Sequence, residues 1–184
     1  MPNYVKNFLR ITGKKEVVKC LLEAVAKGDN KFSFNKIVPM PDFVFKGALS
    51  SEDRKNNPNR NWYDWCCYFW GCKWNTNPDD VYVEINENDS DATSLAFIEF
   101  ETPWNRPQPV ITALAFMFPE LDFVHKYADE GIGYNVGTDY YSGGSMIKMD
   151  TFTEGSEAAK RFACELWDRD YDEYIKDLEG EDDE

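Results

Sequence analysis

Residues Asn61 to Trp74 read Asn-Trp-Tyr-Asp-Trp-Cys-Cys-Tyr-Phe-Trp-Gly-Cys-Lys-Trp, and the rest of the chain is interpreted around this stretch. It contains four of the six tryptophans and three of the five cysteines. Its apolar residues recur at i, i+3, i+4 and i+7, which predicts a helix; they are Trp62, Trp65, Cys66 and Phe69. Tyr63, Cys67 and Trp70 lie on the opposite face. The helix is therefore apolar nearly all round, and we expect it to be mostly buried.

Both ends of this helix have residues that favour a terminus. Asn61 can cap the start, and Asp64 follows three residues later as a short form of the capping-box acid. Gly71 is well placed to end the helix. An aromatic stripe at this spacing is usually core packing rather than a ligand site, so we interpret the segment as an insertion helix that fills the core.

Hydrophobic periodicity predicts the other elements along the chain. We expect strands at residues 5–11, 31–34, 81–85, 95–101, 123–128, 132–136 and 145–149. We expect helices at residues 13–28 and 109–118, and a long C-terminal helix that starts at Thr153 or Ser156. Residues 86–93 should form a hairpin loop and residues 137–144 a flexible turn.

The order of these elements predicts one α+β domain over residues 1–184. Helices should pack on one face of a mostly antiparallel sheet, around the buried aromatic helix. The order contains the split β-α-β pieces of a ferredoxin-like arrangement. No internal repeat or long linker divides the chain.

The C-terminal segment, residues 155–184, is predicted to be an acidic helix with a frayed tail over the last five residues. Its apolar stripe shifts around the axis, because Trp167, Tyr171 and Tyr174 are out of phase with the stripe before them. Beside the stripe lies an acidic row, made of Glu165, Asp168 and Asp172.

The formal net charge of −14 is unevenly distributed. Residues 1–73 contain 13 basic and 7 acidic residues, whereas residues 150–184 contain 4 basic and 14 acidic ones. A negative surface repels nucleic acid and attracts basic proteins, and it also keeps a protein soluble. No leader-like or membrane-spanning apolar run is present, and the odd number of cysteines suits free thiols, so we expect a cytoplasmic protein.

Three segments together show a family resemblance. They are Trp62-Tyr-Asp-Trp-Cys-Cys with Trp70-Gly-Cys-Lys-Trp-Asn75; Phe100-Glu-Thr-Pro-Trp-Asn-Arg-Pro-Gln-Pro-Val110; and Phe118-Pro-Glu-Leu-Asp-Phe, continuing to Gly131. With the opening residues 2–13, they resemble the YubB-like family of plasmid- and phage-borne proteins over residues 1–137. Cys72 stands where the family pattern has threonine. The resemblance implies a ferredoxin-like domain and a mobile-element setting, and it assigns no catalytic residues.

Chemistry-bearing residues form no convincing catalytic pattern. Cys66 and Cys67 point about 100° apart on a helix, which does not suit a shared metal ion with Cys72. His125, the only histidine, alternates with Phe123 and Tyr127 on one strand face, where packing is its commonest role. We therefore expect no cofactor and no metal, and we favour a protein that is not an enzyme. A small enzyme that uses a cysteine or His125 remains an alternative.

We expect a non-catalytic module that binds a macromolecular protein partner. Direct nucleic-acid binding is not expected, because the basic residues lie N-terminally while the strands from Val81 onward are acidic. A second hypothesis is an acidic mimic of nucleic acid that inhibits a host defence protein. Partner binding is predicted at Glu165, Asp168, Asp172, Trp167, Tyr171, Tyr174, Asp79 and Asp80. The aromatic members of this set could equally form a homodimer contact.

Overall fold

A computed structural model describes residues 2–58, 60–87 and 93–181. Its strands are β1 (Tyr4–Lys14), β2 (Tyr82–Glu87), β3 (Thr93–Pro103), β4 (Asp122–Asp129), β5 (Gly137–Ser142) and β6 (Ser145–Thr151). Its helices are α1 (Lys15–Val25), α2 (Phe34–Ile37), α3 (Ser51–Asn56), α4 (Trp62–Phe69), the 3₁₀ helix η1 (Pro78–Asp80), α5 (Gln108–Met117), α6 (Glu157–Leu166) and α7 (Tyr171–Glu181).

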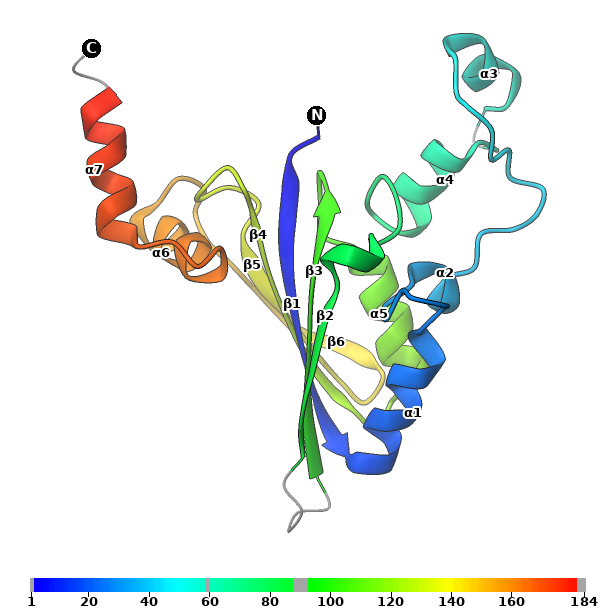
Figure 1. The fold of residues 1–184 in the computed structure, drawn as a ribbon, viewed down its shortest axis with the longest axis horizontal. Helices are drawn as coiled ribbons and strands as arrows, with labels where there is room; N and C mark the ends of the chain where they lie inside the picture. The colour runs from blue at the N-terminus through cyan, green and yellow to red at the C-terminus, as the bar shows by residue number, and fades with distance from the viewer. Residues whose placement is uncertain (1, 59, 88–92, 182–184) are drawn as a thin grey trace.

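The six strands form one antiparallel sheet in the order β2-β3-β1-β4-β5-β6 (Figure 1). Strands β1 and β2 are joined through α1, and β3 lies between them in the sheet. Strands β3 and β4 are joined through α5, and β1 lies between them. These are two interleaved split β-α-β units, as a ferredoxin-like arrangement requires. The predicted α+β, ferredoxin-like fold is confirmed, and β5 and β6 extend it at one edge.

The main core lies between one face of the sheet and helices α1, α2 and α5. Alternation along β1 places Leu9 and Ile11 in this core, since successive side chains of a strand point to opposite faces. Helix α6 lies on the other face, against β4, so the helices are not confined to the single face that the sequence predicts. There Ala159 and Ala163 form a second, smaller core with Ala128.

Several predicted elements differ from the structure. Residues 31–34 are not a strand, because side chains bind their backbone: Asn30 Oδ1 accepts from Phe32 N, and Asn75 Oδ1 accepts from Phe34 N. Residues 132–136 are not a strand either, because Gly133 and Asn135 have positive φ angles of 93° and 43°.

The predicted turn at 137–144 is mostly strand β5, and only its last two residues, Gly143 and Gly144, form the turn before β6. The predicted C-terminal helix is two helices, because Asp168 adopts a φ of 53° and ends α6. This break explains the shifted apolar stripe. Parts of the predicted hairpin loop and frayed tail, residues 88–92 and 182–184, lie outside the described residues. No helix in the described ranges is long and apolar enough to cross a membrane.

Candidate functional site

The aromatic helix α4 is anchored to the core by one side and exposed on the other. Asn61 caps it as predicted, because its Oδ1 accepts from Asp64 N at 2.9 Å. Trp65 and Cys66 are buried, and the indole of Trp70 donates to Val38 O at 2.9 Å. Tyr68 and Phe69, in contrast, are 77% and 45% exposed. The predicted burial therefore applies to the inner side of the helix only.

The exposed side of α4 borders an open apolar hollow of about 580 Å³. It is lined by Val38, Pro39, Pro41, Phe43, Pro58, Arg60, Trp65 and Phe69. Phe43, from the segment that faces α4, is 71% exposed. Trp65 and Phe69 also border a second hollow of about 380 Å³ together with Asp64 and Tyr68. We call these two adjoining hollows the α4 groove; α4 stands at the upper right of the molecule in Figure 1.

The α4 groove has an apolar floor and a cationic rim. The rings of Trp65 and Phe69 stack with centroids 5.0 Å apart. Pro39 and Pro41 lack backbone N–H groups and hold fixed φ angles, so this wall cannot close as a paired strand. Arg60 adds a cation beside the rings. The described residues that line the groove are apolar and aromatic apart from Asp64 and Arg60.

The cysteines of α4 are placed for packing. Burial raises the pKa of the Cys66 thiol to about 12, and burial likewise raises the pKa of Cys72. A thiol with a raised pKa holds its proton at neutral pH, whereas a nucleophile or metal ligand must be a thiolate. In the described part of the chain, no group of three or more His, Cys, Asp or Glu residues is arranged to hold a metal ion.

His125 is fully buried within a polar network on the face of the sheet that also carries Phe123 and the main core. Its Nε2 lies 3.0 Å from Asn7 Oδ1, while the amide nitrogen of Asn7 donates to Val5 O and Thr102 Oγ1, each at 2.8 Å. Across the strands, His125 faces Asp139, whose carboxylate accepts from Arg106 Nε at 2.9 Å. Burial is the main reason that the pKa of His125 is lowered to about 3, so the imidazole is neutral.

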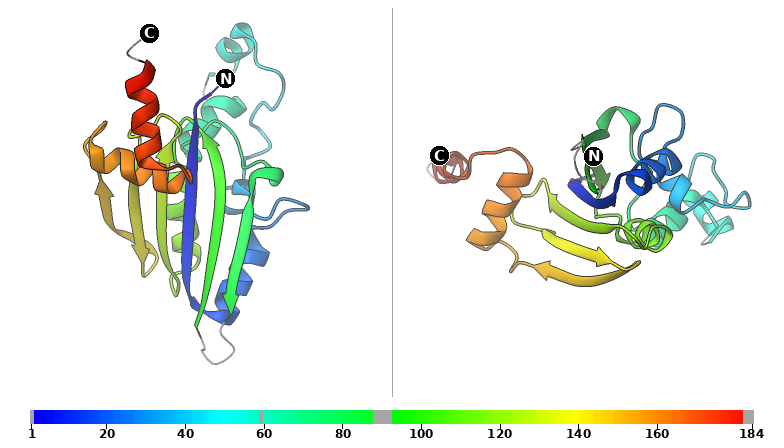
Figure 2. Two further views of the ribbon diagram at one scale, coloured as in Figure 1. Left: turned by 60° about the vertical axis from the view of Figure 1, so that its left-hand side comes forward. Right: turned by 90° about the horizontal axis from the view of Figure 1, so that it is seen from below.

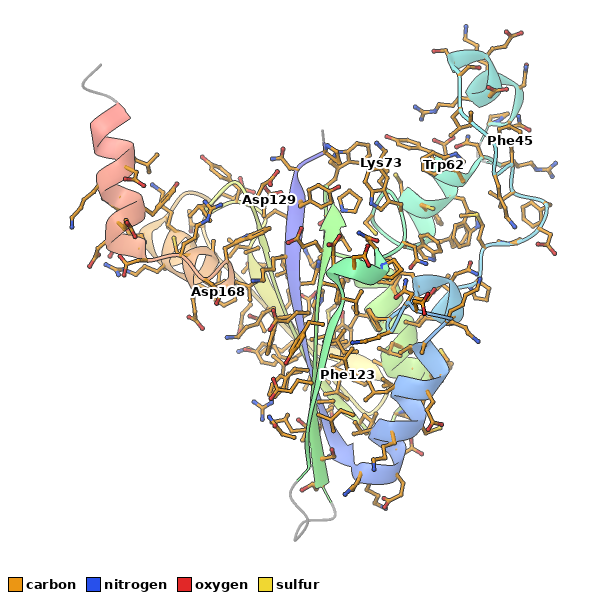
Figure 3. The ribbon with its side chains drawn as sticks, viewed as in Figure 1. Phe45, Trp62, Lys73, Phe123, Asp129 and Asp168 are labelled. Carbon is orange, nitrogen blue, oxygen red and sulfur yellow. The ribbon has the colours of Figure 1, made fainter. Side chains whose placement is uncertain are left out.

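Two motifs that are distant in sequence meet at Lys73 (Figure 3). Its ammonium lies 4.6 Å from the ring centroid of Trp74 and 4.7 Å from that of Trp104. Such contacts hold a cation over the negative face of an aromatic ring. Trp104 has a φ of 73°, a strained conformation for this residue, which the contact helps to fix.

The predicted acidic row is divided between two helices and the link between them. Asp168 accepts from Lys6 Nζ at 3.0 Å, and Glu165 lies 3.6 Å from Lys126 Nζ, so both carboxylates face cations of the sheet. Asp172 is exposed on α7, apart from these pairs. These ion pairs border a hollow of about 170 Å³ that also includes Phe8 and Glu99.

Asp79 and Asp80 are exposed in η1, near the end of β3. Burial is the largest cause of the raised pKa of Glu101, and the negative charge of Asp80 adds to it while Lys6 opposes it. Lys6 and Glu101 form a cross-strand pair. Asp80 acts on the Glu101 carboxyl, and Asp168 accepts from the Lys6 ammonium. The structure brings these two parts of the predicted site toward one another, with a lysine between them.

The aromatic residues predicted to bind a partner, Trp167, Tyr171 and Tyr174, are half-buried against the second core. The indole of Trp167 donates to the carbonyls of Ala128 and Asp129 at 3.2 and 3.1 Å. Arg161 stacks on Tyr171 at 3.9 Å, and Tyr174 is half-buried in the same cluster. Tyr68 and Phe69 are among the exposed aromatic side chains, although they lie on α4, the helix that was expected to be buried.

The family of the chain follows from comparison with known proteins. Residues 69–179, more than half of the chain, match the family model described as a ferredoxin-like domain in Api92-like protein. The chain belongs to this family. Among solved structures, the crystal structure of the protein api92 from Yersinia pseudotuberculosis is similar, with a TM-score of 0.53 and 11% sequence identity.

The alignment with api92 covers 85% of this chain and 100% of that one, and at this identity it shows the fold alone. No curated protein matches the sequence. The predicted ferredoxin-like domain is thus confirmed, whereas neither comparison names a YubB-like, plasmid or phage family. The Api92-like match begins at Phe69, so β1 and most of α4 lie before it.

Proposed function

We propose that this Api92-like protein is a non-catalytic module that binds a protein partner through the α4 groove. The observation that supports this proposal is the clustering of exposed Phe43, Tyr68 and Phe69 along the two hollows of the α4 groove. Contiguous exposed apolar surface is rare on proteins that have no partner, and aromatic side chains with arginine are typical of binding hot spots. The partner segment would be apolar, with a carboxylate placed against Arg60.

Affinity capture with matched variants tests this proposal. The tagged wild-type protein and the double variant Phe43→Ala/Phe69→Ala are used to capture proteins from a lysate of the source organism. Phe116→Ala is the control, because Phe116 is 77% exposed on α5, away from the groove. We expect one protein to be captured by the wild type and the control but at least about tenfold less by the double variant.

Apolar contact also predicts that capture survives about 0.5 M NaCl, where exposed charges are screened. Equal capture by the double variant would show that the groove is not the binding surface. Circular dichroism of each variant establishes that the fold is kept.

The acidic-mimic hypothesis keeps one supporting observation. Helix α7 projects from the body of the molecule, and Asp172, Glu173 and Asp177 are exposed along it (Figure 1). Carboxylates on a projecting helix are accessible to a basic protein, although Glu165 and Asp168 are engaged by lysines. Capture of a nucleic-acid-binding protein that is lost in the triple variant Asp172→Asn/Glu173→Gln/Asp177→Asn would support mimicry, and unchanged capture would refute it.

We also propose a cytoplasmic, mobile-element setting. The five cysteines Cys20, Cys66, Cys67, Cys72 and Cys164 are all free thiols, which suits a reducing compartment. The mobile-element setting rests on the resemblance of the tryptophan and Thr-Pro-Trp motifs. Its test is the genomic context of close relatives: integrase, conjugation or phage genes beside them are expected.

A further inference from the structure

Much of the second face of the sheet has no helix over it. Helices α1, α2 and α5 cover the first face, and α6 covers the second face only near the ends of β1 and β4 around Ala128 (Figure 2, left). Most side chains beyond α6 are half-buried or exposed, whereas Thr138 is buried. We call this uncovered region the open face.

The strand register arranges the open face in two adjacent rows. The first row runs across the sheet as Glu84, Phe97, Arg10, Val124, Tyr140 and Lys148. The second runs as Tyr82, Glu99, Phe8, Lys126, Thr138 and Asp150. Each row therefore alternates aromatic, cationic and small or acidic side chains. This arrangement is not visible in the sequence, since the rows join strands that are up to about 140 residues apart.

An aromatic pair lies in the middle of the open face. Phe8 on β1 and Phe97 on β3 are in contact, with ring centroids 5.3 Å apart and planes at 36°. Neither ring is fully buried, although both are on central strands. Tyr82, at the β2 edge, is 56% exposed, and Tyr140 lies under Lys148 at 5.0 Å. Aromatic rings in this position offer π-faces to a planar ligand.

Cations stand beside these rings. Arg10 is exposed between Phe97 and Val124, and no described residue forms an ion pair with it. Lys126 follows Phe8 in the neighbouring strand position, at the edge of α6, where its ammonium lies 3.6 Å from Glu165 and 5.5 Å from the ring centroid of Phe162. Taken together, the two rows contain three basic residues, Arg10, Lys126 and Lys148, and three acidic ones, Glu84, Glu99 and Asp150. These two rows are thus neutral on a chain of net charge −14.

We propose that the open face binds single-stranded nucleic acid, with bases stacked on Phe8 and Phe97, one phosphate placed at Arg10 and a second at Lys126, where it replaces the contact with Glu165. Sequence-tolerant binding of single strands combines stacking on aromatic side chains with cations along the backbone. RNA-recognition motifs, which are four-stranded sheets, stack two or three bases in this way. A duplex does not fit, because its bases are already stacked on one another.

The fold brings basic and aromatic side chains together although they are far apart in the sequence. Along the chain, the basic groups lie N-terminally, apart from the later strands. In the sheet, however, β1 is central and pairs with both β3 and β4, so its Arg10 stands beside Phe97 of β3 and Val124 of β4. The hollow beside Phe8, with Glu99 and Glu165 at its edge, offers carboxylates to the exocyclic amino groups of a base.

This inference is independent of the α4 groove, which belongs to the helical side of the molecule (Figure 1). It is tested by fluorescence anisotropy with labelled 12-nucleotide oligo(U), oligo(A) and oligo(dT), and with a duplex of the same length, in about 50 mM salt. Phe8→Leu and Phe97→Leu remove the ring but keep an apolar side chain, and Arg10→Gln removes the charge. Phe116→Leu, on the helical side, is the matched control.

We expect the wild type and the control to bind single strands in the micromolar range and the duplex at least about tenfold more weakly. Each of the three open-face variants should weaken single-strand binding about 5- to 50-fold. The RNA and DNA probes distinguish which strand is preferred, and preference for either supports the proposal. The slope of log affinity against log salt should be shallow, about −1 to −2, because only two or three phosphates are neutralised.

Two results would overturn the proposal. One is the absence of single-strand binding at about 100 µM protein, a concentration at which even non-specific complexes form. The other is binding that the Leu and Gln variants leave unchanged. If oligonucleotides do not bind but sedimentation shows a dimer that Phe97→Leu dissociates, the face belongs to a second copy of the chain and nucleic acid is excluded.

Discussion

At the scale of single residues, the hydrogen bonds around His125 determine which ring nitrogen holds its proton. The amide nitrogen of Asn7 is already used by Val5 O and Thr102 Oγ1, so its Oδ1 must point at the imidazole. Nε2 therefore holds the proton and donates it, which fixes the neutral tautomer. A second proton on the ring would be buried near Arg106, whose charge further lowers the pKa.

His125 should make the stability of the protein depend on pH. Its folded-state pKa, about 3, lies below the ordinary 6.5, so its contribution is complete above about pH 6.5 and is lost as pH falls toward 3. His125→Gln keeps an N–H for Asn7 but does not titrate. We expect the wild type to lose up to about 1.4 kcal/mol per pH unit relative to this variant below pH 6. Urea unfolding between about pH 7 and 4.5 measures it; parallel curves for the two proteins would contradict the assignment.

Asn61 should be the most important helix cap. It is fully buried, accepts from Asp64 N, and donates to Asn57 O at 3.0 Å. Asn61→Ala removes the cap and leaves the half-buried Asp64 N without its acceptor, so we expect a loss of about 2 kcal/mol in the free energy of unfolding. Ser50→Ala is the control: it removes an exposed capping box from the short helix α3 and should cost under about 1 kcal/mol. Equal losses in urea unfolding would disprove the ranking.

The two residues also show how far sequence reasoning extends at this scale. The cap at Asn61 was predictable, because capping depends on a donor three residues away. The strand face of His125 was predictable from alternation with Phe123 and Tyr127. Its partner Asn7 was not, since their contact spans 118 residues and depends on the pairing of β1 with β4.

At the scale of elements, the junction between α4 and α5 depends on Gly71. Its φ is 79°, and a Cβ there would lie 2.8 Å from Pro109 Cδ and 3.2 Å from Arg106 O. The end of α4 is thus pressed against the start of α5. The junction positions both the aromatic helix and Arg106, the partner of Asp139.

Gly71→Ala should therefore destabilise the fold more than a glycine substitution with conformational strain alone. Gly143 provides that control, because its φ is 59° and nothing lies within 4 Å of its Cβ position. We expect Gly143→Ala to cost about 1 kcal/mol and Gly71→Ala about 1–3 kcal/mol more, from strain plus overpacking. Thermal and urea unfolding of both variants measure the difference. Equal costs would mean that the junction can relax without loss.

Elements with clear periodicity were predicted correctly, as β3, β4 and α5 illustrate. The errors come from backbone conformations that side-chain patterns do not encode. Gly133 and Asn135 interrupt an apolar run that looks like a strand, and Asp168 divides one apparent helix into two. The second side of α4 was misjudged for a different reason: aromatic residues look the same in sequence whether they fill a core or line a groove.

For the whole molecule, charge is the dominant surface property. A net charge of −14 on 184 residues destabilises a compact state by self-repulsion. The acidic residues of α7 stand away from the sheet (Figure 1), which reduces but does not remove this cost. The strand order could be anticipated from the split β-α-β units. The addition of β5 and β6, and the rows of the open face, could not, because both depend on long-range register.

Salt should stabilise the protein at neutral pH. Raising NaCl from about 20 mM to about 500 mM shortens the range of repulsion, so we expect the melting temperature to rise by about 3–6 °C. Near the isoelectric point of about 4.5 the net charge vanishes and the rise should disappear. Calorimetry at the two pH values measures this. A rise of the same size at both would show that net repulsion is not its cause.

The central place of β1 also affects how the chain is made. This strand leaves the ribosome before its two neighbours, β3 and β4, which end only at Pro103 and Asp129. At about 5–20 residues per second, β1 waits roughly 5–25 s for both partners, with Leu9 and Ile11 unprotected in the meantime. Helix α1 can form early and shield part of β1, yet the sheet closes late in translation. The nascent chain is therefore a natural client for chaperones that hold apolar segments at the tunnel exit.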